Sequence, residues 1–290
     1  MIAVMLVTVL APAVAGWGKQ PRNERQSLLQ LWDEGDYEKV FTVSKASLEA
    51  KPLDYFLLTI HGYSAFHLGI AQINNFDKLT YIDECIWSLR KALLAKNNGN
   101  NGQVYYFLGK AYYHKGDGFA DLAVKYLEEA RAASYAARDI SEYLGLVYAA
   151  VHDYRNSVAA FTLALDPAGD GDEASDRLLL AIANSYLSLE EQDMAKAYLL
   201  RCIETSRDSR AIVAARLLLG GVLAAGGNSE EAEAQYMIVL KETGENAEAR
   251  YQLGKLYAAR DKIPEARAEW RRAIRIDPAH KEARLSLNNM

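Results

Sequence analysis

The sequence contains only two cysteines, Cys85 and Cys202, in 290 residues. Two thiols far apart in the chain favour buried packing residues over a disulfide, and alone they are too few for a zinc site. The five histidines show no H-E-x-x-H or paired metal spacing, and no phosphate loop, dinucleotide fingerprint or G-x-S-x-G elbow is present. These absences predict a protein that is not an enzyme, with no metal, no cofactor and no catalytic residue.

Proline is also scarce, with six residues, and runs of alternating Val, Ile and Thr are rare. Together with abundant Ala and Leu, this scarcity favours an all-helical chain. Half of the residues are hydrophobic, which is enough for an extended core. The formal net charge of -5 gives no reason to expect nucleic acid as a partner.

The N-terminal segment, Met1–Gly18, is uncharged and strongly apolar, and it contains the small-residue pattern Ala13-Val14-Ala15. A short apolar run that ends in such a pattern predicts a signal peptide or a short membrane anchor. The chain is therefore expected to be exported to the periplasm or another extracytoplasmic space, or to stay anchored in the membrane. Basic residues follow the apolar run and none precedes it, which favours an alternative, an anchor that faces the cytoplasm.

The stretch Ala247–His280 has the pattern of two amphipathic helices joined by a turn around Asp261–Lys262. Small residues at Gly254 and Ala266 would let the two helices approach closely, with Trp270 filling the space beside them. At this spacing the pattern resembles the tetratricopeptide repeat, a helix–turn–helix unit of about 34 residues. One such unit cannot bury its apolar face alone, so neighbours of the same kind are expected.

Similar units recur along the chain. They cover residues 21–54, 55–97, 102–137, 138–175, 176–212, 213–246 and 247–280, and a capping helix follows at 281–290. Residues 19–290 are thus similar to a tetratricopeptide-repeat solenoid. The resemblance implies an all-α, right-handed superhelix in which the first helix of each repeat lines a concave groove.

The second unit departs from the pattern, because its segment from Gly69 to Thr80 is longer than a repeat turn. Two structures fit this extra length. Either the two helices of the unit are extended, or the segment forms a protruding loop.

The resemblance also assigns residues to the groove. The candidate binding residues are Tyr63, Phe66, Tyr106, Lys110, Tyr113, Asn184, Tyr251 and Lys255. Tyr and Phe at such positions would anchor a peptide at little cost in conformational entropy. The alternative is that Tyr63, Phe66 and Tyr106 pack against neighbouring helices.

The C-terminal end is basic, with ten Lys or Arg against six Asp or Glu from Ala247 to Met290. Four arginines are predicted to form a basic surface on the last closing helix: Arg267, Arg271, Arg272 and Arg275. This surface either keeps the protein soluble or docks to an acidic protein or an anionic membrane.

These observations predict a non-catalytic scaffold or adaptor at the cell envelope that binds a segment of one or more partner proteins, themselves membrane-associated or in the envelope. One alternative is a structural subunit of a large membrane-associated assembly, in which repeats stack with neighbours or by self-association. Another is an accessory protein of a transport system that holds a small or lipidic ligand.

Overall fold

The computed structural model describes residues 23–95, 101–165 and 173–289, and all regular secondary structure in these residues is helical. The all-α fold is therefore confirmed. The chain divides into two compact units, Met1–Lys96 and Asn97–Met290. The predicted signal or anchor segment, Met1–Gly18, lies outside the described residues. Within these residues, no helix combines the length and apolar character needed to cross a membrane.

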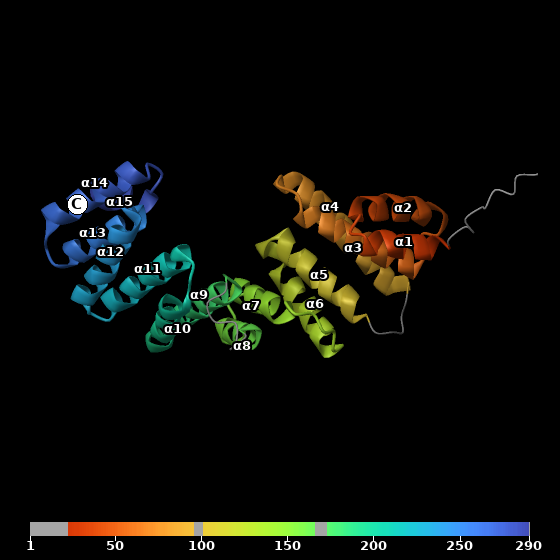
Figure 1. Ribbon diagram of the computed structural model, residues 1–290, viewed down its shortest axis with the longest axis horizontal. Coiled ribbons are helices and arrows are strands. Elements are labelled where there is room, and N and C mark those ends of the chain that lie inside the picture. Colours follow the sequence, from red (N-terminus) through yellow and green to blue (C-terminus); the bar gives the residue numbers. More distant parts are fainter. Residues whose placement is uncertain (1–22, 96–100, 166–172, 290) are drawn as a thin grey trace, which may run out of the picture. The chain divides into compact units, whose positions relative to one another are not determined.

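The first unit consists of two helical hairpins (Figure 1). Its helices are α1 (Glu24–Asp33), α2 (Tyr37–Ala50), α3 (Tyr55–Ile70) and α4 (Asn75–Ala95). Each helix packs on the next one in the chain. The turn between α1 and α2 contains Gly35 at a φ of 75°, and the carboxylate of Asp36 then caps α2 by accepting from the Lys39 amide. Leu28, Val40 and Leu57 are buried between these helices.

The second hairpin of this unit is long, with 16 residues in α3 and 21 in α4. Its two helices stay in contact because glycines on α3 face large side chains of α4. A Cβ atom at Gly62 would lie 2.6 Å from Leu89, and one at Gly69 would lie 3.2 Å from Ile82. Residues 75–80 form the start of α4, so the extra length of this repeat extends the helices and does not form a loop.

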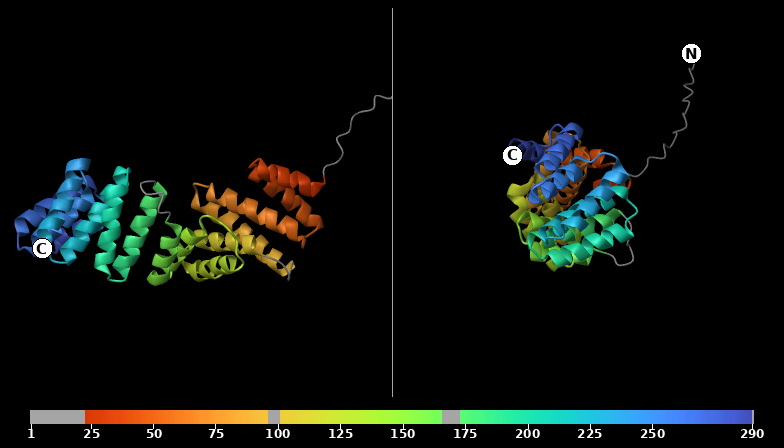
Figure 2. Two further views of the ribbon diagram at one scale, coloured as in Figure 1. Left: turned by 60° about the horizontal axis from the view of Figure 1, so that its bottom comes forward. Right: turned by 90° about the vertical axis from the view of Figure 1, so that its left-hand side faces the viewer.

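The second unit continues the pattern of hairpins (Figures 1 and 2). Its helices are α5 (Gly102–Lys115), the 3₁₀ helix η1 (Asp117–Phe119), α6 (Ala120–Ala132), α7 (Ile140–Ala150), α8 (Tyr154–Ala164), α9 (Glu173–Ser188), α10 (Gln192–Thr205), α11 (Ser209–Ala225), α12 (Ser229–Thr243), α13 (Ala247–Ala259), α14 (Ile263–Ile276) and α15 (Lys281–Asn288). Besides its chain neighbours, α11 also contacts α9 and α13. The first helices of successive hairpins therefore lie side by side on one face of the unit.

A glycine on each of α5, α7, α11 and α13 accounts for the close packing within these four hairpins. The facing pairs are Gly109–Leu127, Gly145–Phe161, Gly220–Tyr236 and Gly254–Trp270. A Cβ atom at Gly254 would lie only 2.3 Å from the indole Nε1 of Trp270. The close approach that the sequence predicted for the hairpin after Ala247 is confirmed.

The last helix closes the C-terminal end of the second unit. Ala283 of α15 is completely buried and packs with Ala266, Trp270 and Ala273 of α14. Elsewhere in the core, Cys85 and Cys202 are buried free cysteines, as the sequence analysis predicted.

Candidate functional site

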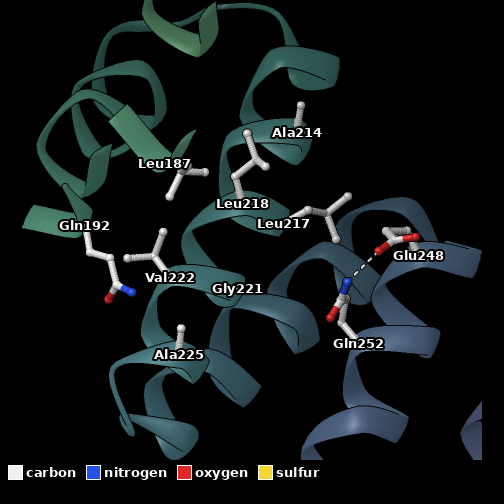
Figure 3. Close-up of a pocket in the computed structure, with 10 residues that line it drawn as sticks. All are labelled: Leu187, Gln192, Ala214, Leu217, Leu218, Gly221, Val222, Ala225, Glu248 and Gln252. Atoms are coloured by element: carbon white, nitrogen blue, oxygen red, sulfur yellow. Dashed lines mark hydrogen bonds between the residues drawn. The ribbon is translucent and has the colours of Figure 1, made fainter. Parts of the chain in front are cut away.

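An apolar groove lies across the first helices of three successive hairpins, α9, α11 and α13 (Figure 3). It encloses a volume of about 550 Å³ and is lined by Leu187, Gln192, Ala214, Leu217, Leu218, Gly221, Val222, Ala225, Glu248 and Gln252. This volume lies within the range of protein sites that bind ligands. Most of the lining is aliphatic, so the groove is suited to another apolar surface.

Helix α11 forms the centre of the groove. Ala214, Leu217, Leu218, Gly221 and Ala225 follow one another at helical spacing and therefore share one face of α11. The opposite side of α11 is buried against α12, where Gly220 meets the ring of Tyr236. Helix α11 thus has one apolar face in the core and a second apolar face in the groove.

Two leucines show how this second face differs from the core. Leu219 is 2% exposed, whereas Leu217 and Leu218, two positions and one position earlier, keep part of their surface accessible. Both leucines also pack against the edge of the core, so each contributes one part of its side chain to the core and leaves another part accessible. Apolar side chains at both positions favour a binding surface, because contiguous apolar patches on monomers often mark interaction sites.

Gly221 keeps the middle of the groove open. A Cβ atom at this residue would meet no atom within 4 Å, so hairpin packing does not require a glycine at this position. A larger side chain there would fill the groove.

The polar groups of the groove lie on its edge. Glu248 on α13 accepts a hydrogen bond from Gln252 Nε2 at 2.7 Å (Figure 3), and its other oxygen lies 3.3 Å from His280 Nε2. Gln192, at the start of α10, is exposed on the opposite edge. The lining residues offer apolar contact, amide groups and one carboxylate.

Comparison with known proteins identifies the repeats. The family described as tetratricopeptide repeat matches residues 176–209 and 247–280, which comprise most of α9 with all of α10, and α13 with α14. The chain contains tetratricopeptide repeats. No significant match was found among curated protein sequences.

Solved structures share the tetratricopeptide-repeat fold. The C-terminal part of a repeat-containing protein from Cytophaga hutchinsonii superposes with a TM-score of 0.63 at 15% identity, covering 91% of this chain and 99% of that one. PilF of Pseudomonas aeruginosa superposes with a TM-score of 0.54 at 14% identity, covering 79% of this chain and 97% of PilF. YrrB, described as having an unusual peptide-binding site, superposes with a TM-score of 0.50 at 24% identity. The match covers 70% of this chain and 98% of YrrB. At these identities the similarity concerns the fold alone.

None of the eight candidate binding residues lines this cavity, although the cavity lies on the first helices of successive hairpins, where the resemblance to tetratricopeptide repeats places a groove. In the sequence, the three consecutive leucines Leu217–Leu219 on α11 were the feature that could have indicated this groove. Only one of three consecutive leucines can point fully into a hairpin core, so the others are left for a different surface.

Tyr106 and Lys110 on α5 belong to a polar network between neighbouring repeats. The Tyr106 hydroxyl donates to Asp139 at 2.5 Å, and Lys110 Nζ donates to the same carboxylate at 2.8 Å. Burial, followed by the bond to Asp139, raises the pKa of Tyr106. The Lys110 ammonium also lies 4.4 Å from the ring centre of Tyr143 on α7. These contacts link α5 to α7.

Tyr63 and Phe66 on α3 are buried, at 8% and 1% exposure. The ring of Tyr63 lies 6.1 Å from that of Trp32. A side chain with as little accessible surface as Phe66 packs in the core, so for this residue the structure supports packing and not the predicted peptide contact. The same holds for Tyr63 and Tyr106, each at 8% exposure.

The other predicted groove residues keep accessible surface. Tyr113 packs edge-on against Tyr143 at 5.4 Å, Tyr251 lies 5.0 Å from His280, and Asn184 and Lys255 are exposed. These four residues are spread over α5, α9 and α13 and form no single cluster. Their role in binding stays a prediction.

The predicted basic surface is divided by an ion pair. Arg272 of α14 pairs with Glu269, and Glu269 is buried and also accepts from Arg250 at 2.9 Å. Arg271 and Arg275 are exposed, whereas Arg267 is half-buried. Docking of an acidic partner on this surface stays a prediction.

One arrangement that the sequence analysis missed superficially resembles a catalytic triad. Ser44 Oγ lies 2.9 Å from His61 Nδ1, and His61 Nε2 lies 3.0 Å from Glu84 Oε1. Ser44 is completely buried and its hydroxyl donates to the Val40 carbonyl at 2.6 Å. It therefore offers no accessible nucleophile, and the three side chains connect α2, α3 and α4.

Proposed function

We propose that the protein is a non-catalytic interaction scaffold whose groove on α9, α11 and α13 binds a segment of a partner protein. The observation that carries this proposal is the second apolar face of α11, centred on Leu217, Leu218 and Gly221. Burial of such a face removes apolar surface from water, which is the main favourable contribution to protein association.

The lining also defines the chemistry of the partner segment. An apolar face fits along α11, and a Lys or Arg of the same segment would reach the Glu248 carboxylate at the edge of the groove. The peptide-binding site for which YrrB is described, on a similar fold, is compatible with this proposal.

We place this scaffold at the cell envelope, either exported or anchored in the membrane. The support is the sequence of Met1–Gly18, an apolar run with a small-residue cleavage pattern. Its partners are then proteins of the envelope or the membrane.

The experiment that tests the groove uses a photo-crosslinking amino acid at Leu218 in the full chain, followed by identification of the crosslinked proteins from native membranes. Replacing Gly221 with Leu should fill the groove and reduce partner crosslinking by about tenfold or more, since one lost apolar contact is worth roughly that factor. The fold should be unaffected, because a Cβ at Gly221 meets no neighbour.

The matched control is Ala234→Leu, which introduces the same side chain at an exposed position of α12 outside the groove. This variant should crosslink like the unmodified chain. Equal crosslinking by the Gly221→Leu variant would contradict the proposal.

A further inference from the structure

The turn between α3 and α4 exposes three large apolar side chains. Ile73 is 104% exposed, Phe76 is 76% exposed and Ile70 is 44% exposed. Ile73 is therefore fully accessible to solvent, and no other described part of the chain covers it. We refer to these three residues as the apolar tip. Isolated apolar residues on a surface are ordinary, but three at the end of one hairpin form a patch.

The apolar tip contains no charge. From Leu68 to Phe76 the sequence is LGIAQINNF, with His67 before it and Asp77 after it. A surface that enters a medium of low dielectric constant must avoid unpaired charges, because their transfer costs several kcal/mol or more. This stretch satisfies that condition.

The polar side chains of the turn bond to its own backbone. Gln72 Nε2 donates to the Leu68 carbonyl at 3.1 Å, and Asn74 Oδ1 accepts from the Phe76 amide at 2.9 Å. The Gln72 amide itself donates to the Gly69 carbonyl. These bonds pair groups that water would otherwise have to solvate at the ends of both helices. These bonds satisfy part of the polar groups of the turn, which lowers the cost of removing the apolar tip from water.

The apolar tip is held on a rigid support. Gly69 of α3 lies against Ile82 of α4, and Ile82 is completely buried. The extension of this hairpin is thus packed down to its last turns. Binding through the tip requires no prior ordering of the hairpin.

We propose that the apolar tip inserts into the interfacial region of a lipid bilayer. The shape favours a membrane over a protein partner, because a protruding apolar point fits a deformable surface, whereas a protein partner would need a matching pocket. The inference also rests on the envelope location proposed above, for which the support is the apolar sequence of Met1–Gly18. Insertion to a depth of roughly 5–10 Å is typical of such contacts.

Because the apolar tip carries no charge, its insertion should not require anionic lipids. Neutral phosphatidylcholine vesicles should be sufficient, and insertion should be insensitive to salt. Contact through the exposed Arg271 and Arg275 would instead need anionic lipid and would weaken as salt screens the charges.

The experiment measures the environment of the apolar tip itself, because the N-terminal segment of the full chain could bind vesicles by itself. An Ile73→Cys variant is labelled with an environment-sensitive fluorophore and mixed with phosphatidylcholine vesicles. The native thiols react slowly, since both are buried and burial raises the pKa of Cys202 to about 11 and that of Cys85 also upward. Emission from the tip should shift to the blue and be quenched by brominated lipid.

The matched control is a label at Thr42→Cys, an exposed position of α2 in the same unit. Its emission should stay unchanged. Adding Phe76→Ser to the tip-labelled protein should lower the partition coefficient of the labelled tip by about tenfold, the factor expected for one lost apolar side chain. Far-ultraviolet circular dichroism should remain the same, because Phe76 contributes no buried core surface.

Three outcomes would overturn the proposal. They are an unshifted label at the tip, a shift of the same size at Thr42→Cys, and a shift that occurs without vesicles and grows with protein concentration. The last would assign the apolar tip to contact with a second copy of the chain.

Discussion

At the scale of single residues, two adjacent glycines of α11 have opposite surroundings. A Cβ atom at Gly220 would lie 2.4 Å from the ring of Tyr236, whereas one at Gly221 would touch nothing. The first glycine is required for the contact between α11 and α12, and the second keeps the groove open. The same amino acid therefore serves the fold at one position and the candidate site at the next.

This contrast predicts opposite effects of alanine. Gly220→Ala should destabilise the protein by about 1–3 kcal/mol, because the Tyr236 ring must move to avoid the added methyl group. Gly221→Ala should be neutral or stabilising by up to about 1 kcal/mol, since alanine favours a helix interior. Unfolding in urea, followed by circular dichroism, measures both. A loss of stability in the Gly221→Ala variant would mean that this residue is packed and not open.

At the scale of secondary-structure elements, the long hairpin α3–α4 is joined by a polar pair as well as by its glycines. The bond from His61 lowers the pKa of Glu84, against the opposing effect of burial, and the positive end of Lys45 adds a smaller favourable contribution. Since His61 also lies 2.9 Å from Ser44, one histidine connects α2, α3 and α4.

The lowered pKa of Glu84 makes its contribution depend on pH. The ionised carboxylate stabilises the folded state fully above its pKa in the unfolded chain, near 4.3. The contribution is lost as the pH falls through the lower folded value. Glu84→Gln should therefore be less stable than the unmodified protein at pH 6, and the difference should shrink as the pH approaches 3. Urea unfolding over this range measures it, and a difference that grows on acidification would contradict the assignment.

At the scale of the whole molecule, the chain consists of two compact units in which helices pack mainly on their neighbours in sequence. Such an architecture distributes stability along the chain, because each repeat depends on the interface with the next. In the second unit, α15 packs against α14 and covers the C-terminal end.

This arrangement predicts local opening from the C-terminal end. Amide protons of α14 and α15 should exchange faster than those of α10 to α12, which have repeats on both sides. Ala283→Asp places a charge in a fully buried position and should speed exchange in α14 and α15 by about tenfold or more. Hydrogen exchange read by mass spectrometry tests this, and an equal acceleration in α10 to α12 would show that the unit opens as a whole.

The sequence by itself determined the helical hairpins and their packing signature. Gly254 and Ala266 were assigned to a close approach of two helices, with Trp270 beside them, because this approach lies within a single hairpin and repeats along the chain. The extra length after Gly69 was also visible, although helix extension and a loop fitted it equally.

Only the tertiary structure decided which faces stay open. Accessibility depends on the neighbouring hairpin as well as on the helix itself. Phe66 is buried although its repeat position was assigned to a groove, and Leu218 lines a groove although it reads as one leucine among three. Likewise, the exposure of Ile73 and the approach of Glu84 to His61 follow from how α3 and α4 pack, which no local pattern records.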